Sequence, residues 1–122
     1  MPPALAAAIS VAVDIARFED WRRDKLARLI RHFRHGAAKR GIQLMASRTP
    51  IQPVVIGSSA AALSAMRSLE SDGFYVPAIR PPTVPKDKAR LRVVLSARHE
   101  EGDVERLLNA LARAVGHSRT QH

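Results

Sequence analysis

The sequence contains no cysteine and few aromatic residues, and these absences exclude several classes of site. Without cysteine there is no disulfide, no thiolate metal site and no cysteine nucleophile, and the missing disulfide framework favours a reducing compartment. Aromatic residues make up 4% of the chain, too few for a platform on which nucleic-acid bases stack. No apolar run reaches the roughly 18 residues of a membrane span, and residues 1–8 lack a secretory signature. We therefore expect a cytoplasmic protein with no membrane partner.

The sequence does contain enough apolar material for a folded core. Its 122 residues are 46% hydrophobic and 25% charged, which is close to the average of globular domains. A chain of this length forms one small domain, so we do not expect a two-domain enzyme within it. Basic residues exceed acidic residues by 20 to 11, which gives a net charge of +9 and makes an anionic partner worth testing.

Hydrophobic periodicity and turn residues predict four helices and three strands. Two helices come first, over residues 1–18 and 19–40, and Gly41 supplies the left-handed residue that commonly ends a helix. The remaining predicted elements are a strand over 51–56, a helix over 60–73, strands over 74–79 and 91–95, and a helix over 101–115. The smallest consistent architecture is an α+β fold, in which a three-stranded sheet carries helices on one face.

The first predicted helix differs from the others because residues 1–18 hold almost no polar side chains. A helix that is apolar all round is normally buried on several sides, and a chain of this size has little material to surround one. We therefore expect residues 1–18 to form an apolar linking helix that packs against another copy or a missing large domain, with residues 19–122 as the α+β domain. A non-catalytic partner that docks through this helix is one candidate function.

The second predicted helix carries most of the excess charge, because nine basic and three acidic residues lie between Arg17 and Arg40. A cation-rich helix can bind phosphate backbones through counterion release. However, Asp24 and Arg28 stand four residues apart, a spacing at which opposite charges pair, so a solvated surface explains the same pattern. A small basic nucleic-acid-binding module is therefore an alternative function, and only weak, nonspecific binding is expected of it.

Two further motifs have both a functional and a structural interpretation. His32 and His35 stand three residues apart and can face one metal ion, but no third ligand is evident, so we predict no metal site. Gly57 with Ser58 or Ser59 is similar to a turn that holds phosphate at the start of a helix. It lacks the further glycines and the lysine of those motifs, so a helix cap is the simpler interpretation. We assign no catalytic or cofactor-binding residue from these motifs.

A stretch rich in proline and cations links the last two predicted strands. Arg80 follows one strand and Arg92 lies in the next, while Pro81, Pro82 and Pro85 stiffen the connection. Two arginines on adjacent strands, held by a rigid loop, can present a planar fork to a carboxylate. An ordinary solvated loop is the alternative, and the residue pattern does not decide between them.

Longer stretches of the chain resemble a known family. The segments are AIRPPTVP, ARLRVVLSARHEEGDVERLLNAL, IQPVVIG and MPPALAAA, and together they cover essentially the whole chain in order. They are similar to the C-terminal part of the 8-amino-7-oxononanoate synthases, a branch of the α-oxoamine synthase family. The resemblance implies the small C-terminal domain of a fold type I enzyme that uses pyridoxal phosphate. Such enzymes condense L-alanine with a pimeloyl thioester, releasing carbon dioxide, in biotin biosynthesis.

The resemblance also implies roles for three residues. Arg92 stands where the family has the arginine that binds the carboxylate of the amino acid or product, and Arg80 and Thr83 stand in the loop that borders the same site. The family's cofactor-bearing large domain, with its Schiff-base lysine, has no counterpart in this sequence. None of the lysines lies in a matching motif, so we expect the chain alone to bind no pyridoxal phosphate and to be inactive. These lysines are Lys25, Lys39, Lys86 and Lys88.

Overall fold

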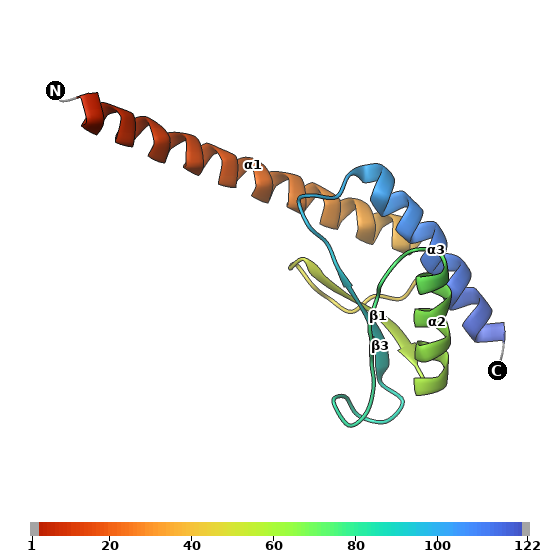
Figure 1. Ribbon diagram of the computed structural model, residues 1–122. Coiled ribbons are helices and arrows are strands. Elements are labelled where there is room, and N and C mark those ends of the chain that lie inside the picture. Colours follow the sequence, from red (N-terminus) through yellow and green to blue (C-terminus); the bar gives the residue numbers. More distant parts are fainter. Residues whose placement is uncertain (1–2, 121–122) are drawn as a thin grey trace.

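The computed structural model describes the backbone of residues 3–120 and the side chains of residues 19–116. Within these residues the elements are α1 (Pro3–Lys39), β1 (Ile51–Gly57), α2 (Ser59–Ser71), β2 (Ala78–Ile79), β3 (Ala89–Val94) and α3 (Glu101–Thr120). The strands form one antiparallel sheet in the order β1-β3-β2, and Figure 1 shows α2, α3 and the C-terminal part of α1 beside it. The predicted α+β fold with a three-stranded sheet is confirmed.

Burial along β3 explains why the helices lie on one face of the sheet. Ala89, Leu91 and Val93 are buried, whereas Arg92 and Val94 are exposed. Successive side chains of a strand point to opposite faces, so the buried set marks an inner face that packs on the helices. We call the opposite side of the sheet, to which Arg92 and Val94 point, the outer face.

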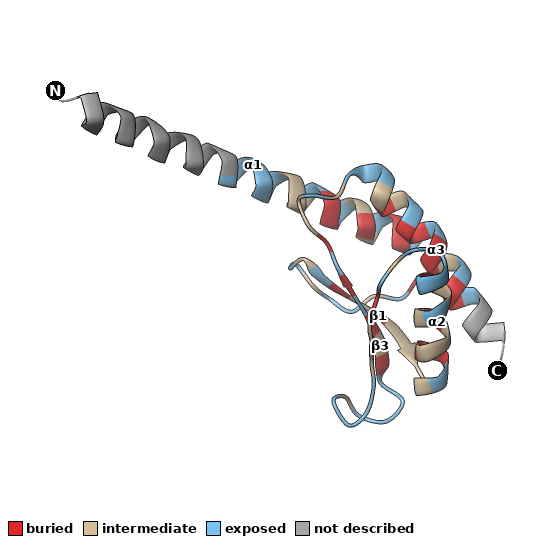
Figure 2. Cartoon of the chain, viewed as in Figure 1, coloured by how far each residue is buried: buried red, intermediate tan, exposed pale blue. Residues whose placement is uncertain are grey.

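One hydrophobic core lies between the inner face and the three helices. Phe33 of α1, Leu69 of α2, Leu91 of β3 and Leu108 of α3 are all completely buried in it. Figure 2 shows the buried residues on the sides of these elements that face one another. Gly36 lets α1 approach α3 closely, because a Cβ atom at that position would overlap with Cδ1 of Leu108.

The two helices predicted for residues 1–18 and 19–40 are one continuous helix, α1. No glycine or proline lies between residues 4 and 35, so the change from an apolar to a charged sequence alters the helix surface and not its backbone. Gly41 follows α1 with a φ of 71°, the left-handed conformation predicted for it. The side chains of residues 1–18, expected to pack against a partner, lie outside the described residues. In the part of the chain that the structure describes, no helix is long and apolar enough to cross a membrane.

β2 is shorter than the strand predicted over residues 74–79. The N–H of Phe74 donates to the carbonyl of Leu69 at 2.8 Å and so closes α2 instead of joining the sheet. Pro77 accepts a hydrogen bond from the N–H of Arg92 at 2.9 Å but has no N–H to return one. The regular ladder is therefore limited to the two residues of β2.

Local side chains cap the first turns of α2 and α3. The Oγ of Ser58 accepts a hydrogen bond from the N–H of Ala61 at 3.1 Å, which confirms the predicted helix cap. At the start of α3, a carboxylate oxygen of Asp103 accepts from the N–H of Glu100 at 2.8 Å. This backbone hydrogen bond is the main reason why the pKa of Asp103 lies below its ordinary value.

Candidate carboxylate-binding site

The outer face of the sheet presents two arginines of β3 in neighbouring rows. Arg90 lies opposite Val55 of β1 and Ile79 of β2, and Arg92 lies opposite Pro53 of β1. Residues that face each other in an antiparallel pair point to the same side of the sheet, so these side chains share the outer face. Both guanidinium groups therefore belong to the side of the sheet that the core does not use.

A further paired segment extends the outer face beyond β1. The N–H of Met45 donates to the carbonyl of Pro53 at 3.1 Å, and the N–H of Val55 donates to the carbonyl of Gln43 at 2.9 Å. Residues 43–45 thus lie along the free edge of β1, although they form only an isolated bridge and no regular strand. Because β3 already pairs with strands on both sides, Arg92 lies in the interior of the face and not at its edge.

The two arginines differ in what holds their side chains. The Nε of Arg90 donates to the carbonyl of Lys88 at 3.1 Å, and its Nη1 lies 2.9 Å from the sulfur of Met45. Arg92 is exposed, and no described residue forms an ion pair or hydrogen bond with its guanidinium. Arg90 is therefore bound within the chain, whereas Arg92 is available to an anion from outside.

Arg80 and Thr83 lie at the two ends of one tight turn after β2. The N–H of Thr83 donates to the carbonyl of Arg80 at 3.1 Å, and the two prolines between them are joined by a cis peptide bond. Pro77 is the residue beside Arg92 in the sheet. Arg80 comes three residues after Pro77, so the backbone of Arg80 lies on the order of 10 Å from that of Pro77 along the strand direction. The structure therefore places Arg80 and Thr83 together, with Arg92 in a separate position on the outer face.

The predicted histidine pair lies on α1. The Nε2 of His32 lies 2.8 Å from Oε1 of Glu105 on α3, and His35 is exposed. Among the residues whose side chains are described, no three His, Asp or Glu side chains are grouped to hold a metal ion. His32 therefore belongs to a contact between two helices.

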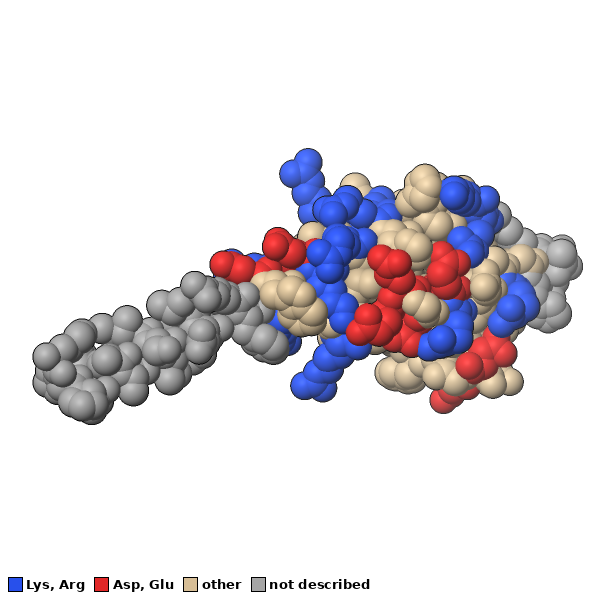
Figure 3. Space-filling model, turned by 90° about the horizontal axis from the view of Figure 1, so that it is seen from above, with Lys and Arg blue, Asp and Glu red and all other residues tan. Residues whose placement is uncertain are grey.

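The same contact governs the titration of Glu105. Burial acts to raise the pKa of this carboxyl group, but the hydrogen bond from Arg40 and the neighbouring imidazole of His32 outweigh burial and leave the pKa below its ordinary value. Figure 3 shows acidic side chains set among Lys and Arg on the side of the molecule that it displays. Charges of both signs therefore neighbour one another on that surface.

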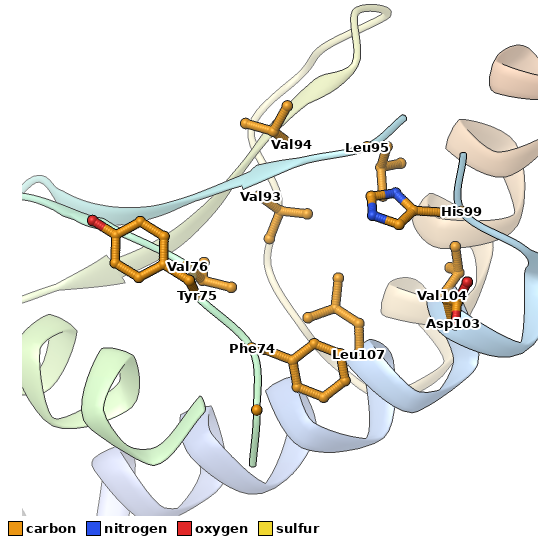
Figure 4. Close-up of a pocket in the computed structure, with 11 residues that line it drawn as sticks. Phe74, Tyr75, Val76, Val93, Val94, Leu95, His99, Asp103, Val104 and Leu107 are labelled. Atoms are coloured by element: carbon orange, nitrogen blue, oxygen red, sulfur yellow. The ribbon is translucent and has the colours of Figure 1, made fainter. Parts of the chain in front are cut away.

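A cavity of about 260 Å³ lies between the segment that precedes β2, the end of β3 and the start of α3. Figure 4 shows Phe74, Val93, His99 and Leu107 around it. The Nδ1 of His99 accepts a hydrogen bond from the N–H of Ser96 at 3.0 Å, so this histidine supports the turn before α3. The sequence gives no signal for the cavity because its lining comes from segments far apart in the chain. Arg92 does not line it, so the cavity is separate from the candidate site.

Comparison with known protein sequences gives matches over most of the chain. A family model described as aminotransferase class I and II matches residues 1–111. An 8-amino-7-oxononanoate synthase from Pseudomonas putida is 60% identical over 111 residues, which are 91% of this chain and 28% of that protein. The chain therefore spans less than a third of the length of this relative.

Solved structures share the same fold. An 8-amino-7-oxononanoate synthase from Francisella tularensis superposes with a TM-score of 0.73 at 18% identity, over 98% of this chain and 35% of that chain. A serine palmitoyltransferase from S. paucimobilis, with a bound PLP–myriocin aldimine, superposes with a TM-score of 0.72 at 23% identity, over 80% of this chain and 25% of that chain. These two likenesses establish the fold.

Proposed function

The chain belongs to the class I and II aminotransferase family, and from this premise we propose that it is the C-terminal part of an 8-amino-7-oxononanoate synthase. Such an enzyme condenses L-alanine with a pimeloyl thioester, with loss of carbon dioxide, in biotin biosynthesis. The 60% identity to the Pseudomonas putida relative supports this proposal. Because the chain covers 28% of that relative, the remainder of the enzyme contributes the rest of the active site.

In this enzyme Arg92 binds the carboxylate of alanine. The observation that carries this assignment is an exposed arginine in the interior of the outer face, with no partner among the described side chains. A guanidinium that donates two parallel hydrogen bonds holds a carboxylate in one plane. Fixing the carboxylate orients the rest of the alanine molecule, which favours reaction with the thioester.

Arg80 and Thr83 border the same site. Both are exposed, and the hydrogen bond between their backbones keeps them together at one turn. Since Arg80 lies about three residues of strand beyond Arg92, it contacts a different part of the substrates and does not share the carboxylate. Its contribution to alanine binding is therefore smaller than that of Arg92.

Pyridoxal phosphate supplies the electron sink for this type of condensation in the complete enzyme. The described residues do not fit a site for it. The Nζ of Lys25 lies 2.7 Å from Oε1 of Glu100, and Lys39, Lys86 and Lys88 are exposed. We therefore assign the cofactor to the remainder of the enzyme and no chemical step to a lysine of this chain.

Residues 1–18 connect this domain to the remainder of the enzyme in our proposal. Their apolar sequence suits a helix that is covered by another part of the protein. The cysteine-free sequence also suits a reducing compartment, so we place the enzyme in the cytoplasm. Neither assignment depends on the role of Arg92.

A chimeric enzyme tests the proposed function. It joins the part of the Pseudomonas putida relative that lies outside the matched region to residues 1–122 of this chain. We expect this chimera to release thiol from a pimeloyl thioester in the presence of alanine and to restore growth of a bacterium that requires biotin because it lacks the synthase. A control chimera with Arg92→Ala should lose most of the alanine-dependent release. A folded chimera that binds pyridoxal phosphate but releases no thiol with alanine would overturn the proposal.

A further inference from the structure

We propose that Pro53 is a positioning residue for Arg92, because its ring forms a rigid wall that confines the arginine side chain on the outer face. The inference rests on the proposed function, since it concerns the same carboxylate. It follows from the strand register, which places Pro53 directly opposite Arg92. No sequence motif assigns a role to this proline beyond its place in a strand.

The hydrogen-bonding pattern brings Pro53 especially close to Arg92. The N–H of Leu95 donates to the carbonyl of Pro50 at 2.9 Å, and hydrogen-bonded pairs alternate with non-hydrogen-bonded pairs along an antiparallel ladder. Counted from that bond, Pro53 and Arg92 form a non-hydrogen-bonded pair, in which the two Cα atoms approach to about 4.5 Å. The proline ring therefore adjoins the aliphatic part of the Arg92 side chain.

A second proline bounds Arg92 on its other side. The N–H of Arg92 donates to the carbonyl of Pro77 at 2.9 Å, so Pro77 occupies the neighbouring position just before β2. Proline rings have a fixed backbone φ and do not move between extended rotamers as long side chains do. Both lateral neighbours of Arg92 are therefore rigid, and the arginine has few ways to fold down onto the sheet.

The rest of the fold compensates for a proline at position 53. A proline inside a paired strand leaves a carbonyl of the adjoining segment without its N–H donor. Here that carbonyl belongs to Met45, whose own N–H donates to Pro53. Arg34 replaces the missing donor, because its Nη1 lies 3.0 Å from the carbonyl oxygen of Met45 and 2.6 Å from Oε1 of the buried Gln52. Pro53 is thus accommodated in the sheet by a specific partner.

Confinement of Arg92 has a selective effect on substrate binding. A freely exposed arginine loses rotamer freedom when it binds a carboxylate, and this loss weakens affinity. A side chain already confined by rigid neighbours loses less, so alanine binds more tightly with no additional hydrogen bond. This gain in affinity applies to the amino acid, whose carboxylate Arg92 binds, and not to the acyl thioester. If Pro53 only stabilised β1, replacing it would not weaken the binding of alanine selectively.

The test uses the chimeric enzyme with one substitution at a time. Pro53→Gly removes the ring beside Arg92, and Val55→Gly is the matched control, on the same strand and face but opposite Arg90. We expect Pro53→Gly to raise the KM for alanine about three- to tenfold and to leave the KM for the thioester within about twofold. Val55→Gly should leave the KM for alanine unchanged, and Pro53→Val, which restores a branched wall, should recover most of the affinity.

Two results overturn the positioning role, namely no rise in the KM for alanine with Pro53→Gly, or an equal rise with Val55→Gly. Arg92→Ala in the same chimera separates this role from the proposed function. If Arg92→Ala leaves the KM for alanine unchanged, Arg92 does not bind the carboxylate and the role of Pro53 fails with it, whereas the proposed function fails only if the unsubstituted chimera releases no thiol with alanine. If Arg92→Ala raises this KM and Pro53→Gly does not, only the role of Pro53 fails.

A second measurement needs no catalysis and uses the chain as it is. Nitrogen-15 relaxation of the Nε–Hε group reports how ordered each arginine side chain is. We expect the Arg92 group to become less ordered in Pro53→Gly, while the group of Arg98, outside the strands, stays the same. If the Nε–Hε group of Arg92 were equally ordered in the unsubstituted chain and in Pro53→Gly, the positioning role of Pro53 would be refuted.

Discussion

Arg40, the residue directly after α1, and Glu105 of α3 form an ion pair, with Nη2 of Arg40 2.9 Å from Oε2 of Glu105. The other carboxylate oxygen lies 2.8 Å from Nε2 of His32. His32 lies within α1 and Arg40 follows its last residue, eight positions later, so one carboxylate of α3 contacts both the body and the C-terminal end of α1. The contact therefore helps to fix how the two helices cross.

We predict that Glu105→Gln makes the stability of the chain less dependent on pH in acid. Burial raises the pKa of Glu105, but the hydrogen bond from Arg40 and the neighbouring His32 lower it by more, so the folded value lies below the unfolded one. Such a group contributes stability above its unfolded pKa, and the contribution is lost as the pH falls through the folded pKa. Urea unfolding between about pH 3 and pH 6 measures the free energy of unfolding of the unsubstituted chain and of Glu105→Gln. The unsubstituted chain should be the more stable near pH 6, and its advantage should shrink toward pH 3.

Glu101→Gln is the control for that experiment, because it removes a carboxylate from the first turn of the same helix. Its free energy of unfolding over the same pH range gives the effect of removing one carboxylate that contacts neither Arg40 nor His32. If the free energies of unfolding of Glu105→Gln and the unsubstituted chain differed by the same amount at every pH, the assigned role of Glu105 would be contradicted.

Two helical glycines should respond in opposite ways to the same substitution. Gly36→Ala places a methyl group against the completely buried Leu108, and overpacking of a core costs about 1–3 kcal/mol. Alanine improves helix propensity by only about 0.5–1 kcal/mol, so we expect a net loss of stability. At Gly116 no described atom lies within 4 Å of an added Cβ, so Gly116→Ala should stabilise the chain. Urea unfolding measures the stability of both variants. An increase in stability with Gly36→Ala would show that Leu108 can move aside.

Arg92→Lys in the chimeric enzyme should weaken catalysis with alanine almost as much as Arg92→Ala. Lysine keeps the charge but cannot donate two parallel hydrogen bonds in one plane. A charge-assisted hydrogen bond contributes about 1.5–3 kcal/mol, which corresponds to a roughly ten- to hundredfold loss in kcat/KM for alanine. Arg80→Ala should cost less. Alanine saturation kinetics give both values, and normal kinetics with Arg92→Lys would remove Arg92 from the site.

The isolated chain should not bind pyridoxal phosphate at a specific lysine. Lys25 is occupied by Glu100 at 2.7 Å, and the remaining lysines are exposed. After treatment with pyridoxal phosphate and borohydride, we expect mass spectrometry to find scattered, partial labelling and assays to find no condensation. Stoichiometric labelling of one lysine together with turnover of alanine would refute this.

Nucleic-acid binding should be weak and sensitive to salt. Arg28, Arg31 and Lys39 are exposed on α1, but the mixed charges of the surface give no reason to expect sequence selectivity. Nonspecific binding has dissociation constants of about 10⁻⁴–10⁻⁶ M at physiological salt. Fluorescence anisotropy with labelled DNA and RNA at two salt concentrations measures this. Nanomolar, sequence-selective binding would instead support the nucleic-acid-binding alternative.

Features set by neighbours in the chain could be predicted from the sequence. The left-handed Gly41 and the cap at Ser58 depend on residues within one helical turn, and both are found. The α+β fold followed from the order of elements and from apolar periodicity. The sequence does not reveal the continuity of α1, because a change from apolar to charged composition near residue 18 resembles a boundary between two helices.

Features set by contacts between distant segments could not be predicted. The relative positions of Arg80 and Arg92 depend on the register of β2 against β3, which no spacing along the chain reveals. The attachment of Arg90 to Met45 joins residues 45 positions apart. A proline within the predicted strand over 51–56 was the one local sign that position 53 is unusual.

The strand at the centre of the sheet is the last of the three to be synthesised. β3 pairs with both β1 and β2, which do not pair with each other. During translation, β1, α2 and β2 therefore leave the ribosome before the strand that joins them. The start of β3 lies roughly forty residues after the start of β1, and translation adds about 5–20 residues per second, so β3 is synthesised several seconds after β1. Completion of the sheet is thus a late step in the synthesis of the chain, and until then the apolar sides of α2 and β1 depend on other contacts for protection.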